Sequence, residues 1–257
     1  MLLFGYVSHV AGIIAGNGFS SEGGFKGIAP KCNIIALKVL DHNGNGNIPD
    51  VLNGFDWILE NKEKYNIKIA NISVGSNGKS EFESESKLVS GVNRLWDAGI
   101  VVCVAAGNNG PSPQSITTPG ISRKVITVGA SDDEETVEVM GNITSDYSGR
   151  GPTKDCICKP DLVAPGSNIW ACRAISRNFF SGSKAMYVKK SGTSMSTPVI
   201  SGCAALVLSK NKYLTNNDVK LILLKSTKNL GIERSRQGNG LIQVDMLLKN
   251  KYVMREF

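Results

Sequence analysis

Histidine is scarce in this sequence of 257 residues, which contains two histidines, and aromatic residues make up only 7% of it. No apolar run approaches the roughly 20 residues that a membrane-spanning helix needs. Residues 1–7 are apolar, but they have neither the basic leader nor the small-residue cleavage site of a signal peptide. These absences argue against a membrane protein, and we expect a cytoplasmic one.

The composition favours a globular α/β protein. Hydrophobic residues make up 41% of the chain, which excludes disorder and suffices for the core of one large domain. Positive charges exceed negative ones by +7, but they are scattered and form no basic stripe interleaved with aromatic residues. We therefore expect no nucleic-acid partner.

The six cysteines do not have the spacing of a metal site. Cys156 and Cys158 are two residues apart, but no second Cys or His pair accompanies them, as a zinc site would require. Cys103 and Cys203 lie within apolar runs, where free cysteines behave as small buried hydrophobic residues. We expect reduced thiols and no bound metal.

Apolar runs alternate with amphipathic segments along the chain, which is typical of βαβ units with a parallel sheet. This pattern predicts strands at residues 33–39, 68–74, 100–106, 124–130, 162–164 and 169–172. Helices are predicted to begin at Pro49, to cover residues 88–96, to begin again at Ser194, and to follow a capping signal at Thr215. The expected fold class is α/β, with three αβα layers around a mostly parallel central sheet.

The most informative stretch is residues 191–198, SGTSMSTP, which continues directly into a helix of small and apolar residues. Ser194 would project from the N-terminus of this helix, where free N–H groups and the positive end of the helix dipole stabilise a nearby anion. This position suits a nucleophilic serine. The alternative is an ordinary helix N-cap, and the stretch alone favours neither.

A second signal follows the continuous apolar run at residues 100–106. Asn108 comes shortly after this predicted central strand, at the carboxyl edge of the sheet where α/β proteins build their sites. Its side-chain amide can donate a hydrogen bond to a developing oxyanion. The alternative is a plain turn, because Asn and Gly are common turn formers.

Several motifs occur together in a fixed order: HVAGIIAG from His9, NISVGS from Asn71, VAAGNNG from Val104, KPDLVAPG from Lys159 and SGTSMSTP from Ser191. In this combination the chain resembles the subtilisin-like serine peptidases (subtilases), over about residues 8–247. The resemblance implies a single peptidase domain over residues 1–257, of the intracellular bacterial type.

The resemblance also implies roles for individual residues. Ser194 corresponds to the nucleophile, and Asn108 together with the Ser194 backbone N–H corresponds to the oxyanion donors. The implied reaction is hydrolysis of peptide bonds in an extended peptide or unfolded protein segment. Two walls of a specificity pocket and an edge segment that pairs with the substrate would be formed by Ser73, Val74, Gly75, Ala105, Ala106, Gly107, Gly44 and Gly46.

The chain departs from the family at the two other members of the catalytic triad, a histidine base and an aspartate. Where the family has His-Gly-Thr-His-Val-Ala-Gly, Tyr6 occupies the position of the base, and His9 matches the second, structural histidine. The catalytic aspartate would lie upstream of Met1, on an N-terminal strand that the family inserts between those matching residues 33–39 and 68–74. We therefore expect a truncated domain with unpaired strand edges and little or no activity alone.

Three functions are compatible with this incomplete triad. They are a serine endopeptidase recorded as an incomplete chain, a non-catalytic peptide-binding module, and one half of a split enzyme that an N-terminal chain completes. The other histidine, His42, lies in a Gly/Asn loop and is expected to be solvated. Many subtilases bind calcium near the segment matching residues 17–26, but Glu22 is its only carboxylate, so no cofactor is expected.

Overall fold

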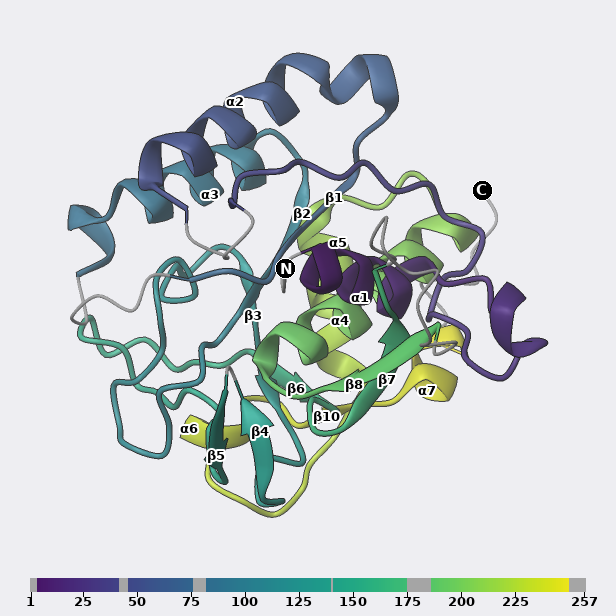
Figure 1. The fold of residues 1–257 in the computed structure, drawn as a ribbon. Coiled ribbons are helices and arrows are strands. Elements are labelled where there is room, and N and C mark those ends of the chain that lie inside the picture. Colours follow the sequence, from purple (N-terminus) through teal and green to yellow (C-terminus); the bar gives the residue numbers. More distant parts are fainter. Residues whose placement is uncertain (1–3, 42–45, 76–81, 140, 175–185, 250–257) are drawn as a thin grey trace.

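The computed structural model describes residues 4–41, 46–75, 82–139, 141–174 and 186–249. A central sheet of six strands runs through the fold in the order β1-β2-β3-β6-β10-β9 (Figure 1). Its strands are β1 (Ile69–Ile72), β2 (Val101–Ala105), β3 (Ile126–Ala130), β6 (Leu162–Ala164), β9 (Thr227–Lys228) and β10 (Leu241–Ile242). All neighbouring strands are parallel except β9 and β10, which confirms the predicted fold class.

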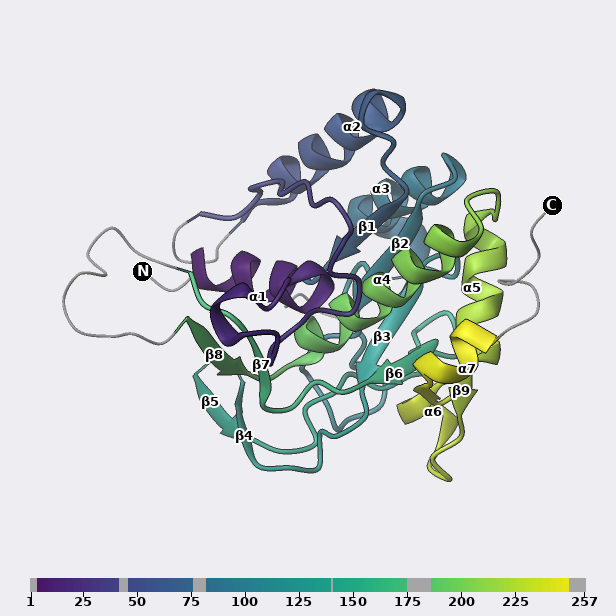
Figure 2. The same ribbon diagram turned by 90° about the vertical axis from the view of Figure 1, so that its right-hand side faces the viewer.

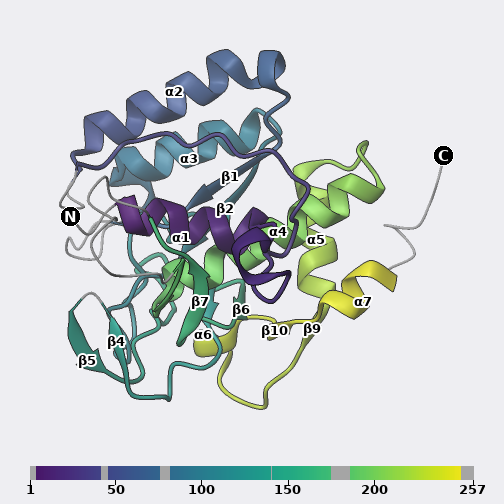
Figure 3. The ribbon, with the colours of Figure 1, turned by 45° about the vertical axis from the view of Figure 1, so that its right-hand side comes forward.

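Helices lie on both sides of this sheet (Figures 2 and 3). On one side α2 (Ile48–Tyr65) packs on α3 (Lys87–Asp97), and on the other α1 (Phe4–Ala15) packs on α4 (Thr193–Lys210). No described helix combines the length and the apolar character that crossing a bilayer requires. The smaller elements are η1 (Phe19–Ser21), η2 (Glu83–Glu85), β4 (Val137–Val139), β5 (Asn142–Thr144), β7 (Ile169–Cys172), β8 (Tyr187–Lys190), α5 (Asn216–Lys225), α6 (Arg234–Gln237) and α7 (Val244–Lys249).

The helix ends follow the capping chemistry of the sequence. Thr215 and Asp218 form a capping box at the start of α5, in which each side chain bonds to the backbone N–H of the other residue. Gly99 has a φ of 84° just after α3, a left-handed conformation that glycine adopts without a steric penalty. The capping signal predicted at Thr215 is confirmed, and the helix predicted over residues 88–96 is observed as α3.

The centre of the sheet is apolar on both faces. All residues of β2 and β3 are buried. For β2 this agrees with the continuous apolar run at residues 100–106, which predicts a central strand. Cys103 on β2 and Cys203 on α4 are buried free thiols, as predicted. β2 and β3 therefore supply a rigid base for the loops at their carboxyl ends.

The predicted strand at residues 33–39 is wrong. This segment is not a strand, and Ile34 and Ile35 have exposed fractions of 43% and 45%. The backbone of residues 33–37 makes no hydrogen bond to the backbone of another described residue. A strand exists only beside a partner, so an apolar β-branched segment without a neighbouring strand stays irregular.

β1 forms an open edge of the sheet. It pairs with β2 on one side, and no described strand pairs with its other side. Because the Val101 N–H donates to the Lys68 carbonyl (2.9 Å), the backbone groups of the alternate residues Ile69, Asn71 and Ser73 point away from β2. The sequence-based expectation of an unpaired strand edge agrees with this arrangement.

Hydrogen exchange of single amides tests the open edge. We expect the amides of Ile69 and Asn71 to exchange at least about tenfold faster than those of Ala70 and Ile72, because only the latter pair donates to β2. Exchange followed by NMR on a labelled sample measures all four amides in one experiment. Equal protection of the four would contradict an open edge.

Candidate functional site

Ser194 lies in the first turn of α4, which begins directly after Gly192. Its hydroxyl donates a hydrogen bond to the Ser73 carbonyl at the end of β1 (2.9 Å). Thr193 and Met195 on either side are buried, whereas Ser194 is half-buried. As the second residue of the helix, Ser194 also has a backbone N–H without an acceptor in the helix.

Asn108 is bonded to the same helix turn. Its Oδ1 accepts hydrogen bonds from the Thr193 N–H (2.9 Å) and from the Thr193 hydroxyl (3.0 Å). The Thr193 hydroxyl in turn accepts a bond from the Gly107 N–H (3.2 Å). These bonds fix the amide plane and leave Nδ2 as a donor beside Gly192, where a Cβ would lie 3.3 Å from it.

The two donors, Asn108 Nδ2 and the Ser194 N–H, are therefore held at the positive end of α4. An oxygen that gains negative charge beside Ser194 would be stabilised by both donors and by the helix dipole. Because Thr193 fixes Asn108 before any ligand arrives, little reorganisation is needed when the charge develops.

Tyr6 faces Ser194 from α1. Its hydroxyl donates to the Ser73 carbonyl (2.5 Å), the same oxygen that Ser194 contacts. Burial raises the pKa of Tyr6 to about 12, and a hydrogen bond with Ser194 acts in the opposite direction. At neutral pH the phenol is therefore a hydrogen-bond donor and a poor acceptor for the Ser194 proton.

His9 lies three residues further along α1 and is fully buried. Its Nε2 donates to the carbonyl oxygens of Ile169 (3.0 Å) and Val188 (3.1 Å), which lie on the paired strands β7 and β8. Burial lowers the pKa of His9, so the ring is neutral. His9 thus joins α1 to this hairpin, and His42 lies outside the described residues.

The two expected walls of a specificity pocket meet at Thr117. A Cβ added to Gly75 would lie 2.8 Å from Thr117 Oγ1, and one added to Gly107 would lie 2.4 Å from Thr117 Cγ2. The Thr117 N–H donates to the Ala106 carbonyl (2.9 Å). The two segments of these walls, 73–75 and 105–107, therefore converge on one side chain.

The expected substrate-pairing edge is only partly described. Gly46 packs against Val39 and Leu40, where an added Cβ would lie 2.8 Å from the Val39 carbonyl oxygen. Gly44 lies outside the described residues. Among the described residues, no group of three or more His, Cys, Asp or Glu side chains could hold a metal ion.

Sequence reasoning missed two functional groups of this site. One is Thr193, which orients Asn108, and the other is the Ser73 carbonyl, which receives the Tyr6 and Ser194 hydroxyls. The adjacency of Thr193 to Ser194 was a signal for the first. A backbone carbonyl leaves no signal in a sequence.

Comparison with known proteins identifies the class. The model of the subtilase family matches residues 7–240, and the chain belongs to this family of subtilisin-like serine peptidases. It is 42% identical to the serine protease AprX of Bacillus subtilis over 87% of this chain and 52% of AprX. It is 35% identical to a thermostable alkaline protease of Halalkalibacterium halodurans over 93% of this chain and 56% of that protein.

Solved structures agree with this assignment. The fold matches sphericase with a TM-score of 0.75 and 28% identity, over 93% of this chain and 77% of sphericase. A psychrophilic protease gives a TM-score of 0.73 with 29% identity, over the same shares of the two chains. The chain thus spans about half the length of the two curated relatives and most of the two solved ones.

The pKa of Tyr6 predicts a stability change at high pH. Between pH 10 and about 12 the native state holds the Tyr6 proton more tightly than the unfolded state, so the free energy of unfolding falls as the pH rises. Relative to Tyr6→Phe, the unaltered protein should lose about 1.4 kcal/mol per pH unit in this window.

Urea denaturation of both proteins from about pH 9 to about pH 12 measures this difference. Tyr147, whose pKa burial also raises, is present in both proteins and cancels. Parallel stability curves for the two proteins would contradict a buried, protonated Tyr6.

Proposed function

We propose that this domain hydrolyses peptide bonds through Ser194. The observation that carries the proposal is the pair of hydrogen bonds that the Thr193 N–H and hydroxyl donate to Asn108 Oδ1. These two bonds orient the amide so that Nδ2 is a donor beside the serine. In the reaction, Ser194 Oγ forms a bond to the substrate carbonyl carbon. The carbonyl π bond opens, and its oxygen becomes negative and is stabilised by Asn108 Nδ2 and the Ser194 N–H. The C–N bond then breaks as the amide nitrogen takes up the proton that Ser194 lost, and water releases the acyl group from Ser194.

The proton of the Ser194 hydroxyl must leave during this attack, and the side chain that faces it is Tyr6. A phenol with a pKa of about 12 accepts that proton poorly at neutral pH. We therefore propose that the described residues alone hydrolyse peptides very slowly. Oxyanion donors preserve some rate, but incomplete triads are about 10⁴–10⁶-fold slower.

The proposed substrate is an extended peptide or an unfolded protein segment. The walls at residues 73–75 and 105–107 converge on Thr117, where they would line a pocket for a substrate side chain. The same walls would serve a non-catalytic peptide-binding module, which is the alternative function. The two are distinguished by the reactivity of Ser194.

We also propose that a complementing N-terminal chain completes the site. The open edge of β1 supports this proposal, because it offers unpaired backbone groups beside Ser73, where Tyr6 and Ser194 meet. An added strand would pair there and could bring a basic group to Ser194. All six cysteines are free thiols, which supports a cytoplasmic location.

A fluorophosphonate probe, which labels only activated serines, tests the nucleophile. We expect very slow labelling of the unaltered chain and about 10–100-fold faster labelling of Tyr6→His, because an imidazole can accept the Ser194 proton. Tyr6→Phe is the matched control and should give no gain. Labelling should disappear in Ser194→Ala.

The same probe tests the oxyanion donor. In the Tyr6→His background, Asn108→Ala should slow labelling about 10²–10³-fold, whereas Asn109→Ala, at an exposed neighbour, should leave it nearly unchanged. Rapid labelling of the unaltered chain would overturn the proposed inactivity. No labelling of Ser194 in any variant would overturn its role as the nucleophile.

Mixing experiments test the complementing chain. The product of the reading frame immediately upstream should restore casein hydrolysis when it is added to this chain. It should also slow exchange of the Ile69 and Asn71 amides at least about tenfold, because a new strand would accept their hydrogen bonds. If the mixture shows neither restored casein hydrolysis nor slower exchange of these amides, complementation is contradicted.

A further inference from the structure

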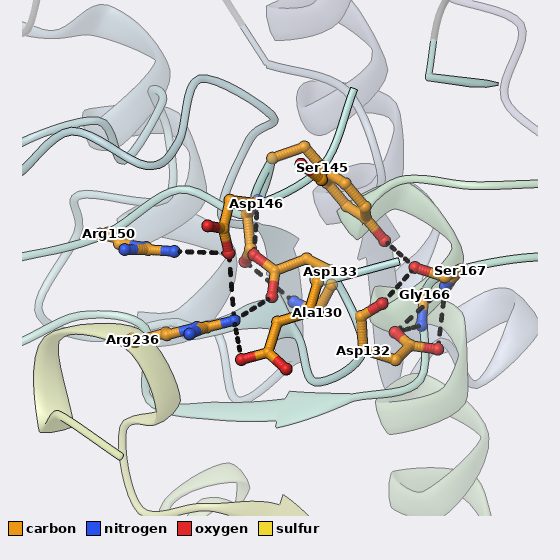
Figure 4. Close-up of polar contacts among 12 residues, drawn as sticks. Ala130, Asp132, Asp133, Ser145, Asp146, Arg150, Gly166, Ser167 and Arg236 are labelled. Carbon is orange, nitrogen blue, oxygen red and sulfur yellow. Dashed lines mark hydrogen bonds and ion pairs between the residues drawn. The ribbon is translucent and has the colours of Figure 1, made fainter. Parts of the chain in front are cut away.

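Two neighbouring aspartates follow β3 and enter different hydrogen-bond networks (Figure 4). The carboxylate of Asp132 accepts bonds from the backbone N–H groups of Gly166 (2.7 Å) and Ser167 (3.1 Å). Its backbone carbonyl accepts a bond from the Ser167 hydroxyl (2.6 Å). Asp132 thus binds the loop that follows β6 through two of its own groups, the side-chain carboxylate and the backbone carbonyl.

Asp133 makes separate contacts. Its Oδ1 forms an ion pair with Arg236 (2.9 Å), and its Oδ2 accepts a bond from the Ser148 N–H (3.1 Å). Arg236 also pairs with Glu134 and Asp146. The Asp133 carboxylate therefore ties α6 to the loops after β3 and β5, and these bonds do not reach Gly166.

The loop that Asp132 holds is bonded directly to the start of α4. The Gly166 carbonyl accepts a bond from the Gly192 N–H (2.9 Å), two residues before Ser194. The Asn168 N–H donates to the Ser191 hydroxyl (3.0 Å). The chain from 191 to 192 is therefore hydrogen-bonded to the loop at two points.

Gly166 is packed so tightly that its position determines the position of Gly192. A Cβ on Gly166 would lie 2.4 Å from Ser196 Oγ, 3.0 Å from the Ala130 Cβ and 3.1 Å from the Gly192 carbonyl oxygen. The residue is thus wedged between β3 and the first turn of α4. A shift of Gly166 must shift Gly192, which packs beside Asn108 Nδ2.

We propose that Asp132 is a positioning residue for Ser194: its carboxylate fixes Gly166, Gly166 fixes Gly192, and Gly192 sets the first turn of α4 against Asn108. This inference deepens the proposed function, on which its catalytic consequence rests. Asp132 touches no substrate in this role and acts only through the backbone of the loop.

Hydrogen exchange tests the positioning without requiring activity. In Asp132→Ala, the amides of Gly192 and Thr193, which donate to Gly166 and Asn108, should exchange at least about tenfold faster, while β3 amides change only in proportion to global stability. Asp132→Asn keeps an Oδ1 acceptor for Gly166 and should restore exchange to within about threefold. Asp133→Ala, compared after correction for global stability, should leave the Gly192 amide unchanged.

If Asp133→Ala does not fold, Asp146→Ala is the second control, because it contacts the same Arg236 and is partly exposed. Unchanged exchange at Gly192 in Asp132→Ala, or an equal rise in Asp133→Ala, would overturn the proposal. So would failure of Asp132→Asn to restore protection.

Kinetics then test the consequence for chemistry. In the complemented enzyme, Asp132→Ala should lower kcat about 10–100-fold with a smaller change in KM, because the bonds of Asp132 lead first to the start of α4 and reach the wall residue Gly107 only through Thr193. A rise in KM with unchanged kcat would overturn the positioning role. If no mixture hydrolyses casein, complementation fails; if the probe labels Ser194 in no variant, the proposed function fails; in both cases the exchange result still decides the positioning of Gly192.

Discussion

The side chain of Asn108 connects the end of β2 to the first turn of α4, and the chemistry of the site depends on this connection. Thr193 supplies both bonds to Asn108 Oδ1 and also accepts a bond from Gly107. Because α4 is almost entirely buried, its first turn cannot move independently of the core. The amide donor and the serine are therefore parts of one rigid unit.

The start of α4 is held from three strands that end at the same edge of the sheet. Ser73 follows β1 and receives the Ser194 hydroxyl, Asn108 follows β2, and Gly166 follows β6. Parallel strands bring their carboxyl ends together, so residues far apart in the chain surround one helix terminus. Among the described residues, the side chain that faces Ser194 from α1 at this helix terminus is Tyr6.

The first turn of α4 has different surroundings on the side of β2 and β6 than on the side of β1. On the side of β2 and β6, Thr193 is bonded to Asn108 and Gly192 is bonded to Gly166. On the side of β1, the strand edge is open, and the phenol of Tyr6 fills the position that faces Ser194. The imidazole of His9, the histidine among the described residues, is hydrogen-bonded to the β7–β8 hairpin and joins this hairpin to α1. His9 therefore has a structural role.

The sequence by itself determined the elements with strong local signals. β6 and β7 were predicted with their observed bounds, and α5 was predicted from its capping residues, because these signals lie within a few positions of the element. The family was also recognisable from motifs, whereas the roles assigned to Ser194, Asn108 and Tyr6 stay predictions.

Tertiary structure decided the rest. Residues 33–39 have a strand-like composition but form no strand, because pairing requires a neighbour that composition does not reveal. Whether Asn108 is a turn former or an oriented donor depended on Thr193, which lies far along the chain. The link from Asp132 to Gly166 spans 34 residues, and such contacts arise only when separate strand ends meet at one edge of the sheet.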